Sequence, residues 1–429
     1  MIHFIKKKLQ TEFTKNIITV LGGSTFSTLL PILISPVLTR LFSVTEIFAP
    51  FTFFISTCYI IASIANSHYT NAILVADTDE EAIGVFQIST LLNGIAFLVI
   101  TVLLFCIGKP MMHYFNAPNS FIHFLFLVPF TIATMGLYAN FLQWNFRQQQ
   151  FKRVALSRML QATITGIVQI LMGLFVHQIN GLIIGFVVGQ LASLIALSMF
   201  TYFDNKNLFK LNSNNNLKKY AKKYNHFFKF QTIADFINVL TQQMPTFLLG
   251  KFNFIQEVGW FGFANRIIIA PSSIITGAIG DVFRQKAAAD YIQKNNAIAI
   301  FKKTLKILLA TMLLPSIIVL FGGPQIFSWL FGTEWRVAGQ YAQVLIIMLF
   351  PKFIVSPLSY MFIIAGKQKE DFFLHLYIFF STMASFYIGY QIFHSAIGML
   401  SCFSANYACI YLIYFIRSFT FAKGKNSLQ

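Results

Sequence analysis

Twelve apolar stretches, each about long enough to cross a bilayer, constrain this fold more than any other feature of the sequence. They cover roughly residues 17–39, 45–66, 83–107, 121–143, 155–176, 181–203, 228–250, 258–282, 298–322, 338–364, 372–392 and 395–416. A helix needs about 20 apolar residues to span the hydrocarbon core. Because 56% of the 429 residues are hydrophobic and only 11% are charged, a water-soluble fold could not cover this apolar surface. The sequence therefore predicts an all-α integral membrane protein with twelve transmembrane helices.

The 32 lysines and arginines fall mainly on one side of this series of helices. Every second loop is nearly free of them, and these loops carry only Arg40, Lys109, Lys251 and Arg336. Loops that remain in the cytoplasm are enriched in lysine and arginine, so we expect both termini to be cytoplasmic. The net charge of +18 is then explained by membrane orientation and the anionic inner leaflet, without a nucleic-acid partner.

A polar, asparagine-rich and basic segment divides the helices into two sets of six. We expect an N-terminal six-helix lobe over 1–203, a cytoplasmic basic linker over 204–227, a C-terminal six-helix lobe over 228–416 and a cytoplasmic tail over 417–429. A short gapless similarity between residues 40–47 and 251–258 supports an internal duplication. Because each half crosses the membrane an even number of times, the two halves would form a parallel repeat. Transporters built in this way bind their substrate between the halves.

Polar residues inside the membrane recur at helical spacing, which indicates faces that avoid lipid. The second predicted helix carries Thr52, Ser56, Tyr59, Ser63 and Asn66, the fifth Gln161, Thr165 and Gln169, the seventh Gln231, Asp235, Asn238 and Gln242, and the tenth Lys352, Ser356 and Ser359. Interhelical hydrogen bonding and a water-filled cavity both explain such stripes, and the carboxylate of the seventh helix favours a cavity. Gly181, Gly185 and Gly189 in the sixth helix predict close helix packing.

Three ionisable residues lie well inside predicted helices: Asp235, Arg266 and Lys352. An isolated charge at the bilayer centre costs on the order of 3 kcal/mol, so each is a candidate for function. At about 1.5 Å per residue, Asp235, Lys352 and Arg266 lie about 10, 18 and 24 Å from the cytoplasmic boundary. These depths favour two cations facing one anionic ligand. A salt bridge between Asp235 and Arg266 is the alternative.

The motifs of the common enzymes are missing from this sequence. It contains no Walker A motif, nucleophile elbow or metal-ligand spacing. The four cysteines lie within the predicted helices and form no CxxC pair, so neither a disulfide nor a metal site is expected. We therefore expect a protein that is not an enzyme and has no cofactor.

Several motifs in chain order resemble those of O-antigen and polysaccharide flippases (Wzx-type). They are Gly22-Gly23-Ser24 through Pro31, residues 35–41 (SPVLTRL), residues 261–267 (FGFANRI) with Pro271, residues 281–283 (DVF), residues 331–339 (FGTEWRVAG) with Tyr341, and residues 353–358 (FIVSPL). The family belongs to the multidrug/oligosaccharidyl-lipid/polysaccharide (MOP) exporter superfamily. Where the family often has Arg-Tyr-Glu after the second helix, this chain has His68-Tyr69-Thr70. A cargo-binding role of that arginine would be absent here or carried by another residue.

The resemblance implies a V-shaped fold and a cargo, an undecaprenyl-pyrophosphate-linked oligosaccharide such as an O-antigen repeat unit. The cargo would be flipped by alternating access from the cytoplasmic to the periplasmic leaflet of the bacterial cytoplasmic (inner) membrane. A polysaccharide polymerase and a chain-length regulator would be partners. Arg266 and Lys352 would bind the pyrophosphate. Further substrate-binding candidates are Arg40, Tyr59, Asn66, Asn238 and Gln242, and Asp235 is the candidate for H⁺ or Na⁺ coupling.

Two other functions remain open at this point. One is a drug or metabolite antiporter of the same superfamily. The other is a membrane-bound glycan polymerase or acyltransferase, which would need an essential acid, base or nucleophile on the outer face. The sequence offers only a few such groups there: Glu46, His113, Glu257, Glu334 and His394.

Overall fold

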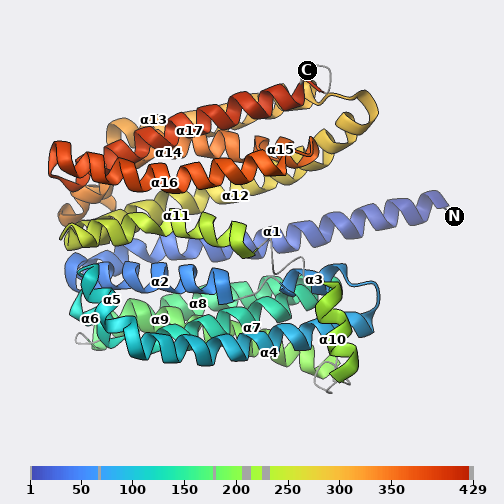
Figure 1. Cartoon of the computed structure of the whole chain (residues 1–429), viewed down its shortest axis with the longest axis horizontal. Coiled ribbons are helices and arrows are strands. Elements are labelled where there is room, and N and C mark those ends of the chain that lie inside the picture. Colours follow the sequence, from blue (N-terminus) through green and yellow to red (C-terminus); the bar gives the residue numbers. More distant parts are fainter. Residues whose placement is uncertain (1, 66–68, 177–179, 205–213, 225–231, 425–429) are drawn as a thin grey trace. The chain divides into compact units, whose positions relative to one another are not determined.

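The computed structural model describes residues 2–65, 69–176, 180–204, 214–224 and 232–424. Over these residues all regular secondary structure is helical (Figure 1). The chain separates into two compact units, Met1–Val239 and Leu240–Gln429, called unit 1 and unit 2 below. The predicted linker 204–227 stays a prediction, because residues 205–213 and 225–227 lie outside the described residues. The parallel repeat and the V shape concern the placement of the units and also stay predictions.

Over the described residues, each of the twelve predicted stretches overlaps a long helix. Those of unit 1 are α1 (Ile2–Leu41), η1 with α2 (Val44–Phe48, Ala49–Ala65), α4 (Asp79–Leu103), α7 (Leu127–Arg147), α8 (Phe151–Phe175) and α9 (Gly181–Asp204). Helix α11 (Thr232–Lys251) contains the boundary between the units. Unit 2 holds α12 (Ile255–Lys294), α13 (Ile298–Phe331), α14 (Arg336–Leu358), α16 (Gln368–Phe393) and α17 (Ala396–Ala422). Shorter elements connect them: α3 (Tyr69–Val75), η2 (Leu104–Gly108), α5 (Lys109–Tyr114), α6 (Asn119–His123), α10 (Asn214–Lys223), η5 (Thr333–Trp335) and α15 (Met361–Ile364).

The outer faces of the long helices are those of a membrane protein. Within the described residues, ten helices are long and apolar enough to cross a bilayer, and α7 and α11 are less apolar than these. Large apolar side chains stay exposed on the outer faces, among them Phe105 at 91% and Trp329 at 79% exposure. Exposed apolar surface on this scale needs lipid around it. The prediction of an all-α integral membrane fold is thereby confirmed.

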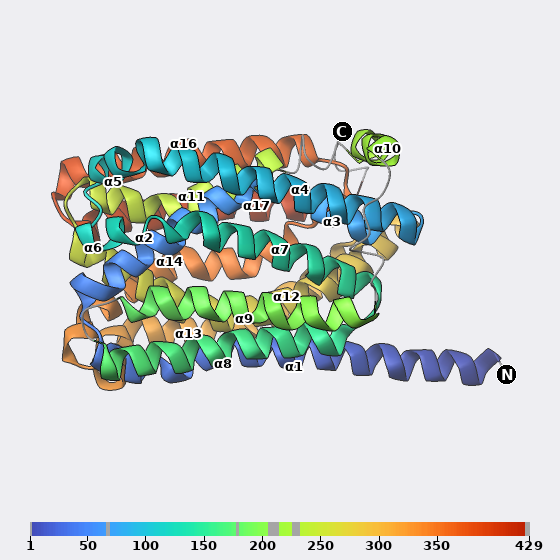
Figure 2. The ribbon, with the colours of Figure 1, turned by 90° about the horizontal axis from the view of Figure 1, so that it is seen from below.

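Glycines let α1, α8 and α9 of unit 1 pack closely side by side (Figure 2). A Cβ atom on Gly23 of α1 would lie 2.6 Å from the Ala155 Cβ of α8. One on Gly185 of α9 would lie 3.0 Å from the Thr165 carbonyl oxygen, and one on Gly189 would overlap the Thr165 hydroxyl. Any larger residue at these positions would push the helices apart. The predicted packing role of the α9 glycines is therefore confirmed.

In unit 2, α13 and α14 meet through two glycines. A Cβ atom on Gly323 would lie 2.7 Å from the Gly339 carbonyl oxygen, and one on Gly339 would lie 2.6 Å from the Pro324 Cα. The atoms in the way belong to the main chain and cannot move aside by rotating a side chain. Because α12 also packs along α14, this contact fixes the central helix of the unit in position.

Candidate functional site

Two of the predicted site residues, Arg266 and Lys352, lie in the same unit on neighbouring helices. Arg266 is on α12 and Lys352 is on α14, and both side chains are partly buried. In the described part of the chain no carboxylate pairs with Lys352. A cation such as Lys352, held in a membrane protein without a nearby counter-charge, is costly unless a ligand or water-filled space meets it. These two residues form the candidate anion site.

The ends of α12 and α14 are held together by an aromatic cluster that includes one of the sequence motifs. Trp335 is 1% exposed, and its ring lies 4.3 Å from the Phe263 ring of α12. Phe263 also packs edge-on against Phe331 at 4.9 Å, and Trp260 donates from Nε1 to the Glu334 carbonyl at 3.1 Å. Gly332 (φ +107°) makes the turn in a conformation that favours glycine. The motif at 331–339 is thus a packing device.

This cluster positions Arg266. Arg266 follows Phe263 by one helical turn, so the two share the face of α12 that is turned to η5 and α14. Lys352 lies three turns after Tyr341 on one face of α14, and the Tyr341 ring lies 6.4 Å from the Trp260 ring of α12. Both cations therefore lie on the faces by which α12 and α14 approach each other.

Two contacts set the register of the parallel helices α12 and α14. Near their N-terminal ends Trp260 meets Tyr341. Farther along, a Cβ atom on Gly280 would lie 3.5 Å from the Pro357 Cβ. Counting about 1.5 Å per residue from both contacts places the two cations about 10 Å apart along the helix axes. Long flexible side chains at this separation can reach two groups of one extended anionic ligand.

The other predicted site residues have varied surroundings. Arg40 is exposed in the last turn of α1, and Tyr59 is 40% exposed on α2. Asn66 and Gln231 lie outside the described residues. On α2 the neighbouring hydroxyls bond to their own helix: Thr52 donates to the Phe48 carbonyl at 2.9 Å and Ser63 to the Ile60 carbonyl at 2.7 Å. These hydroxyls do not by themselves indicate a cavity.

Three residues of the predicted α11 stripe lie on one helical face. Asp235 and Asn238 are partly buried and Gln242 is exposed, and all three take part in interactions. Asp235 and Arg266 belong to different units. Whether they pair therefore stays a prediction, as does a role of Asp235 in ion coupling.

The α8 stripe is an interhelical contact. Gln161 donates from Nε2 to Gln190 Oε1 of α9 at 2.6 Å, and Gln169 donates from Nε2 to the Leu182 carbonyl at 3.0 Å. Thr165 lies against the α9 glycines described above. Of the two explanations left open by the spacing, hydrogen bonding within the bundle holds here.

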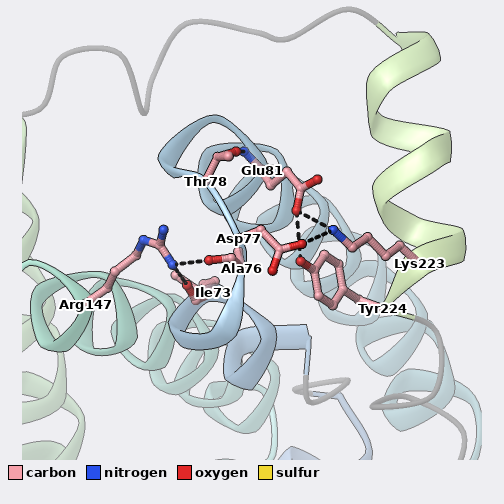
Figure 3. A network of polar contacts seen from close by, with 8 residues as sticks. All are labelled: Ile73, Ala76, Asp77, Thr78, Glu81, Arg147, Lys223 and Tyr224. Atoms are coloured by element: carbon pink, nitrogen blue, oxygen red, sulfur yellow. Dashed lines mark hydrogen bonds and ion pairs between the residues drawn. The ribbon is translucent and has the colours of Figure 1, made fainter.

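A network at one end of unit 1 was missed by the sequence reasoning (Figure 3). Arg147, in the last turn of α7, donates to the Ile73 carbonyl at 3.2 Å and the Ala76 carbonyl at 2.8 Å, and its Nε pairs with Asp79 at 2.9 Å. These bonds satisfy carbonyls at the end of α3, which have no partner within that helix. Arg147 thereby fixes the turn between α3 and α4.

The same network holds the short helix α10 (Figure 3). Lys223 Nζ lies 2.6 Å from Asp77 Oδ2 and 2.7 Å from Glu81 Oε2, and the Tyr224 hydroxyl donates to Glu81 Oε2 at 3.0 Å. The hydrogen bond from Lys223 and its charge lower the pKa of Asp77, and the carboxylates in turn raise the pKa of Lys223. Tyr69 donates to the Ala221 carbonyl at 2.8 Å. Tyr69, in the motif that departs from the family pattern, thus contacts α10.

A second polar cluster, also missed, joins α16 to α17 in unit 2. The Tyr414 hydroxyl donates to Asp371 Oδ1 at 3.1 Å and lies 3.0 Å from His375 Nδ1. Arg417 of α17 donates from Nε and Nη2 to the two carboxylate oxygens of Glu370 of α16. No cluster of three or more metal-ligating side chains occurs in the described ranges of the chain.

Comparison with known proteins agrees with the architecture. A family model described as "Polysaccharide biosynthesis protein" matches residues 37–340. No curated protein matches the chain.

By fold, the chain is similar to an inward-facing multidrug resistance MATE family transporter of the MOP superfamily, with a TM-score of 0.71, 13% identity and 93% of each chain covered. It is equally similar to the lipid II flippase MurJ in an inward closed conformation, with a TM-score of 0.71, 14% identity, and 97% of this chain and 91% of that chain covered. The MATE transporter VcmN of Vibrio cholerae matches with a TM-score of 0.61, 14% identity, and 95% and 96% covered. Because the family model spans well over half of the residues and agrees with the sequence motifs, the chain belongs to the polysaccharide biosynthesis protein family.

Proposed function

We propose that this protein is a flippase for undecaprenyl-pyrophosphate-linked oligosaccharide, such as an O-antigen or related repeat unit. It would move this cargo from the cytoplasmic to the periplasmic leaflet of a bacterial inner membrane by alternating access. The observation that carries the proposal is the pair Arg266 and Lys352 on the adjoining faces of α12 and α14. The match to the polysaccharide biosynthesis family supports the glycan part.

The chemistry of the cargo fits these two cations. A pyrophosphate carries about two negative charges that must leave water to cross the bilayer, and charge-assisted hydrogen bonds replace part of the lost hydration. The planar guanidinium of Arg266 can bind two phosphate oxygens at once, whereas the Lys352 ammonium acts as a point charge. Their axial offset of about 10 Å suits a diphosphate followed by the first sugar. The lipid tail stays in the bilayer throughout.

The remaining assignments extend this mechanism. Tyr59, Asn66, Asn238 and Gln242 would hydrogen-bond the sugar hydroxyls, and Arg40 would meet the cargo near the outer end of α1. Asp235 would bind H⁺ or Na⁺ and couple its movement to transport. A polysaccharide polymerase and a chain-length regulator would use the flipped product.

A drug or metabolite antiporter is the second candidate, because the fold is as similar to a MATE transporter as to MurJ. An antiporter for small cations would not need two positively charged side chains in its site. Transport of organic cations that persists in an Arg266→Ala/Lys352→Gln double variant, together with failure to move lipid-linked glycan, would favour it. A glycan polymerase or acyltransferase would instead alter the covalent structure of the lipid-linked glycan, which mass spectrometry detects.

The test is complementation of a strain that lacks its glycan flippase, scored by surface polysaccharide. Charge-assisted hydrogen bonds contribute about 1.5–3 kcal/mol each, so loss of a bidentate contact should reduce transport on the order of 100-fold or more. Arg266→Ala should abolish export at normal membrane levels, and Arg266→Lys should retain part of it. Arg284→Ala, the same change at an exposed position of α12, is the matched control and should export normally.

The competing salt-bridge hypothesis makes the opposite prediction for a double variant. If Arg266 only neutralised Asp235, Arg266→Ala would leave an uncompensated carboxylate, and adding Asp235→Asn would restore export. Rescue by this double variant would refute a ligand-binding role of Arg266. If Asp235 couples an ion, Asp235→Asn alone should slow transport and alter its dependence on pH or sodium.

The orientation is tested separately. The native cysteines are first replaced by serine, and a single cysteine is introduced at exposed Asn119 or at exposed Lys369. A membrane-impermeant thiol reagent added outside should label the first and spare the second. The reverse pattern would place the basic loops outside and refute the proposed direction of transport.

A further inference from the structure

Helix α10, in the basic segment that the proposed function does not use, has one apolar face. Leu217, Tyr220, Ala221 and Tyr224 share this face at helical spacing. Tyr220 and Tyr224 are 6% and 5% exposed and belong to a core cluster with residues of α3, α4 and α7. Together with the Lys223 ion pairs, this packing makes α10 part of unit 1. The apolar side of the helix is therefore already covered by protein.

The contact with α4 places α10 at the depth of the lipid headgroups. The Tyr220 ring lies against Gly84, where a Cβ atom would come within 2.7 Å of Tyr220 Cε2. Helix α4 begins with three acidic residues, Asp79, Glu80 and Glu81, and its apolar stretch begins near residue 83. The contact thus lies where the hydrocarbon starts.

Two further features agree with this depth. The cluster includes Tyr69 and Trp144, and tyrosine and tryptophan are typical of the membrane–water interface. In Figure 1, α10 runs across the long helices of unit 1 rather than along them. It therefore lies along the membrane surface.

The opposite face of α10 is positively charged. Lys218, Lys219 and Lys222 are exposed and form no ion pair with the described residues. Lys223, by contrast, is neutralised by Asp77 and Glu81. Burial, and after it the charges of Glu80 and Glu81, raise the pKa of Tyr220, so Glu80 also lies near the helix. The face keeps an excess of positive charge at headgroup depth.

We propose that α10 is an interfacial helix that binds the headgroups of anionic phospholipids through Lys218, Lys219 and Lys222. The ligands are the phosphates of the surrounding bilayer, so this site is separate from the proposed cargo site on α12 and α14. Each lysine near an anionic surface strengthens binding about fivefold. Anionic lipid thereby stabilises the docked position of the helix on unit 1.

The test uses the full-length protein in nanodiscs of phosphatidylcholine, with or without phosphatidylglycerol as about a third of the lipid. Amide hydrogen exchange of residues 214–224 reports on docking of α10 and requires no transport activity. Phosphatidylglycerol should slow this exchange roughly tenfold or more, and high salt should weaken the effect by screening. A Lys218→Gln/Lys219→Gln/Lys222→Gln variant should not respond to the anionic lipid.

The matched control is Lys302→Gln/Lys303→Gln/Lys306→Gln on α13, which removes the same charge with the same spacing from exposed positions. This control should keep the slowing of exchange in α10. The proposal is overturned if phosphatidylglycerol leaves the wild-type exchange unchanged, or if both triple variants lose the response equally. It is also overturned if inorganic pyrophosphate, but not phosphatidylglycerol, slows the exchange, because the face would then recognise a diphosphate. None of these outcomes depends on whether the protein flips glycans.

Discussion

The close contact between the Tyr220 ring and Gly84 predicts that Gly84→Leu strongly weakens the docking of α10. The added side chain would occupy the space of the Tyr220 ring, which must then leave its buried position. Gly94→Leu on the same helix is the matched control, because nothing lies within 4 Å of a Cβ atom there. The two variants share the change in helix propensity and differ in the contact with α10.

The expected magnitude follows from the contacts that would be lost. Full burial of an aromatic side chain the size of Tyr220 contributes about 2 kcal/mol. The hydrogen bond from Tyr69 to Ala221 contributes about 1 kcal/mol. Helix propensity does not enter this sum, because α4 is helical whether or not α10 is docked. The total loss of about 3 kcal/mol corresponds to an increase on the order of 100-fold in the population of undocked α10.

Thiol labelling measures this population. A single cysteine at Ala221, in a background without other cysteines, is protected while α10 is docked and reacts when it opens. Gly84→Leu should raise the labelling rate on the order of 100-fold, and Gly94→Leu should leave it unchanged. Equal rates in the two variants would show that Tyr220 does not hold α10 in place.

Three further outcomes are expected. Docking of α10 should be constant between about pH 5 and pH 9 and weaken outside this window. The pKa of Asp77 is lowered, so its contribution to docking is lost as the pH falls through that lowered pKa. The pKa of Lys223 is raised, so its contribution to docking is lost as the pH rises through that raised pKa. Labelling rates against pH should therefore flatten in Lys223→Gln. Gly189→Leu should lower the free energy of unfolding by about 1–3 kcal/mol through overpacking, whereas Gly94→Leu should not, as measured by thermal denaturation in detergent. Trp335→Ala should lower the free energy of unfolding by about 3–5 kcal/mol and reduce glycan export, because the aromatic cluster beside Arg266 is then no longer held in place. Trp335→Phe should retain most of the stability and most of the export.

The helices could be predicted almost completely because a bilayer imposes one requirement on every spanning segment. A segment must be apolar over about 20 residues and satisfy its backbone internally, and both properties can be seen in a single sequence. The prediction extended to α7, although Asn140 and Asn145 make it less apolar. The predicted ends of the helices were less accurate. Helix α12 continues to Lys294, twelve residues beyond the predicted stretch, because a helix can continue into water until a residue ends it.

The candidate site could be predicted only in part. Spacing shows which side chains share a face but not what covers that face, so the stripe of Gln161 and Gln169 looked the same whether it faced water or a helix. Arg266 and Lys352 were found because charges inside a membrane are rare, but their proximity depends on the register of α12 against α14. That register is set by contacts distant in sequence, such as the one between Trp260 and Tyr341.

The docking of α10 was missed for a similar reason. Its apolar face could be found from the spacing of Leu217, Tyr220 and Tyr224, but the surrounding lysines and asparagines dominate the composition of the segment. Its partners, Gly84 and Tyr69, lie more than a hundred residues away. No local pattern indicates such a contact.

The contact between Gly323 and Gly339 has a consequence for how this sequence can change during evolution. At most packed positions a larger residue on one helix can be offset by a smaller one opposite. Here the obstructing atoms on both sides are main-chain atoms, so no substitution on the partner helix can make room. We expect relatives that keep this helix pair to retain glycine at both positions independently, without the correlated exchanges that accompany ordinary side-chain contacts. A relative with a larger residue at one of them should show the two helices farther apart along their whole length.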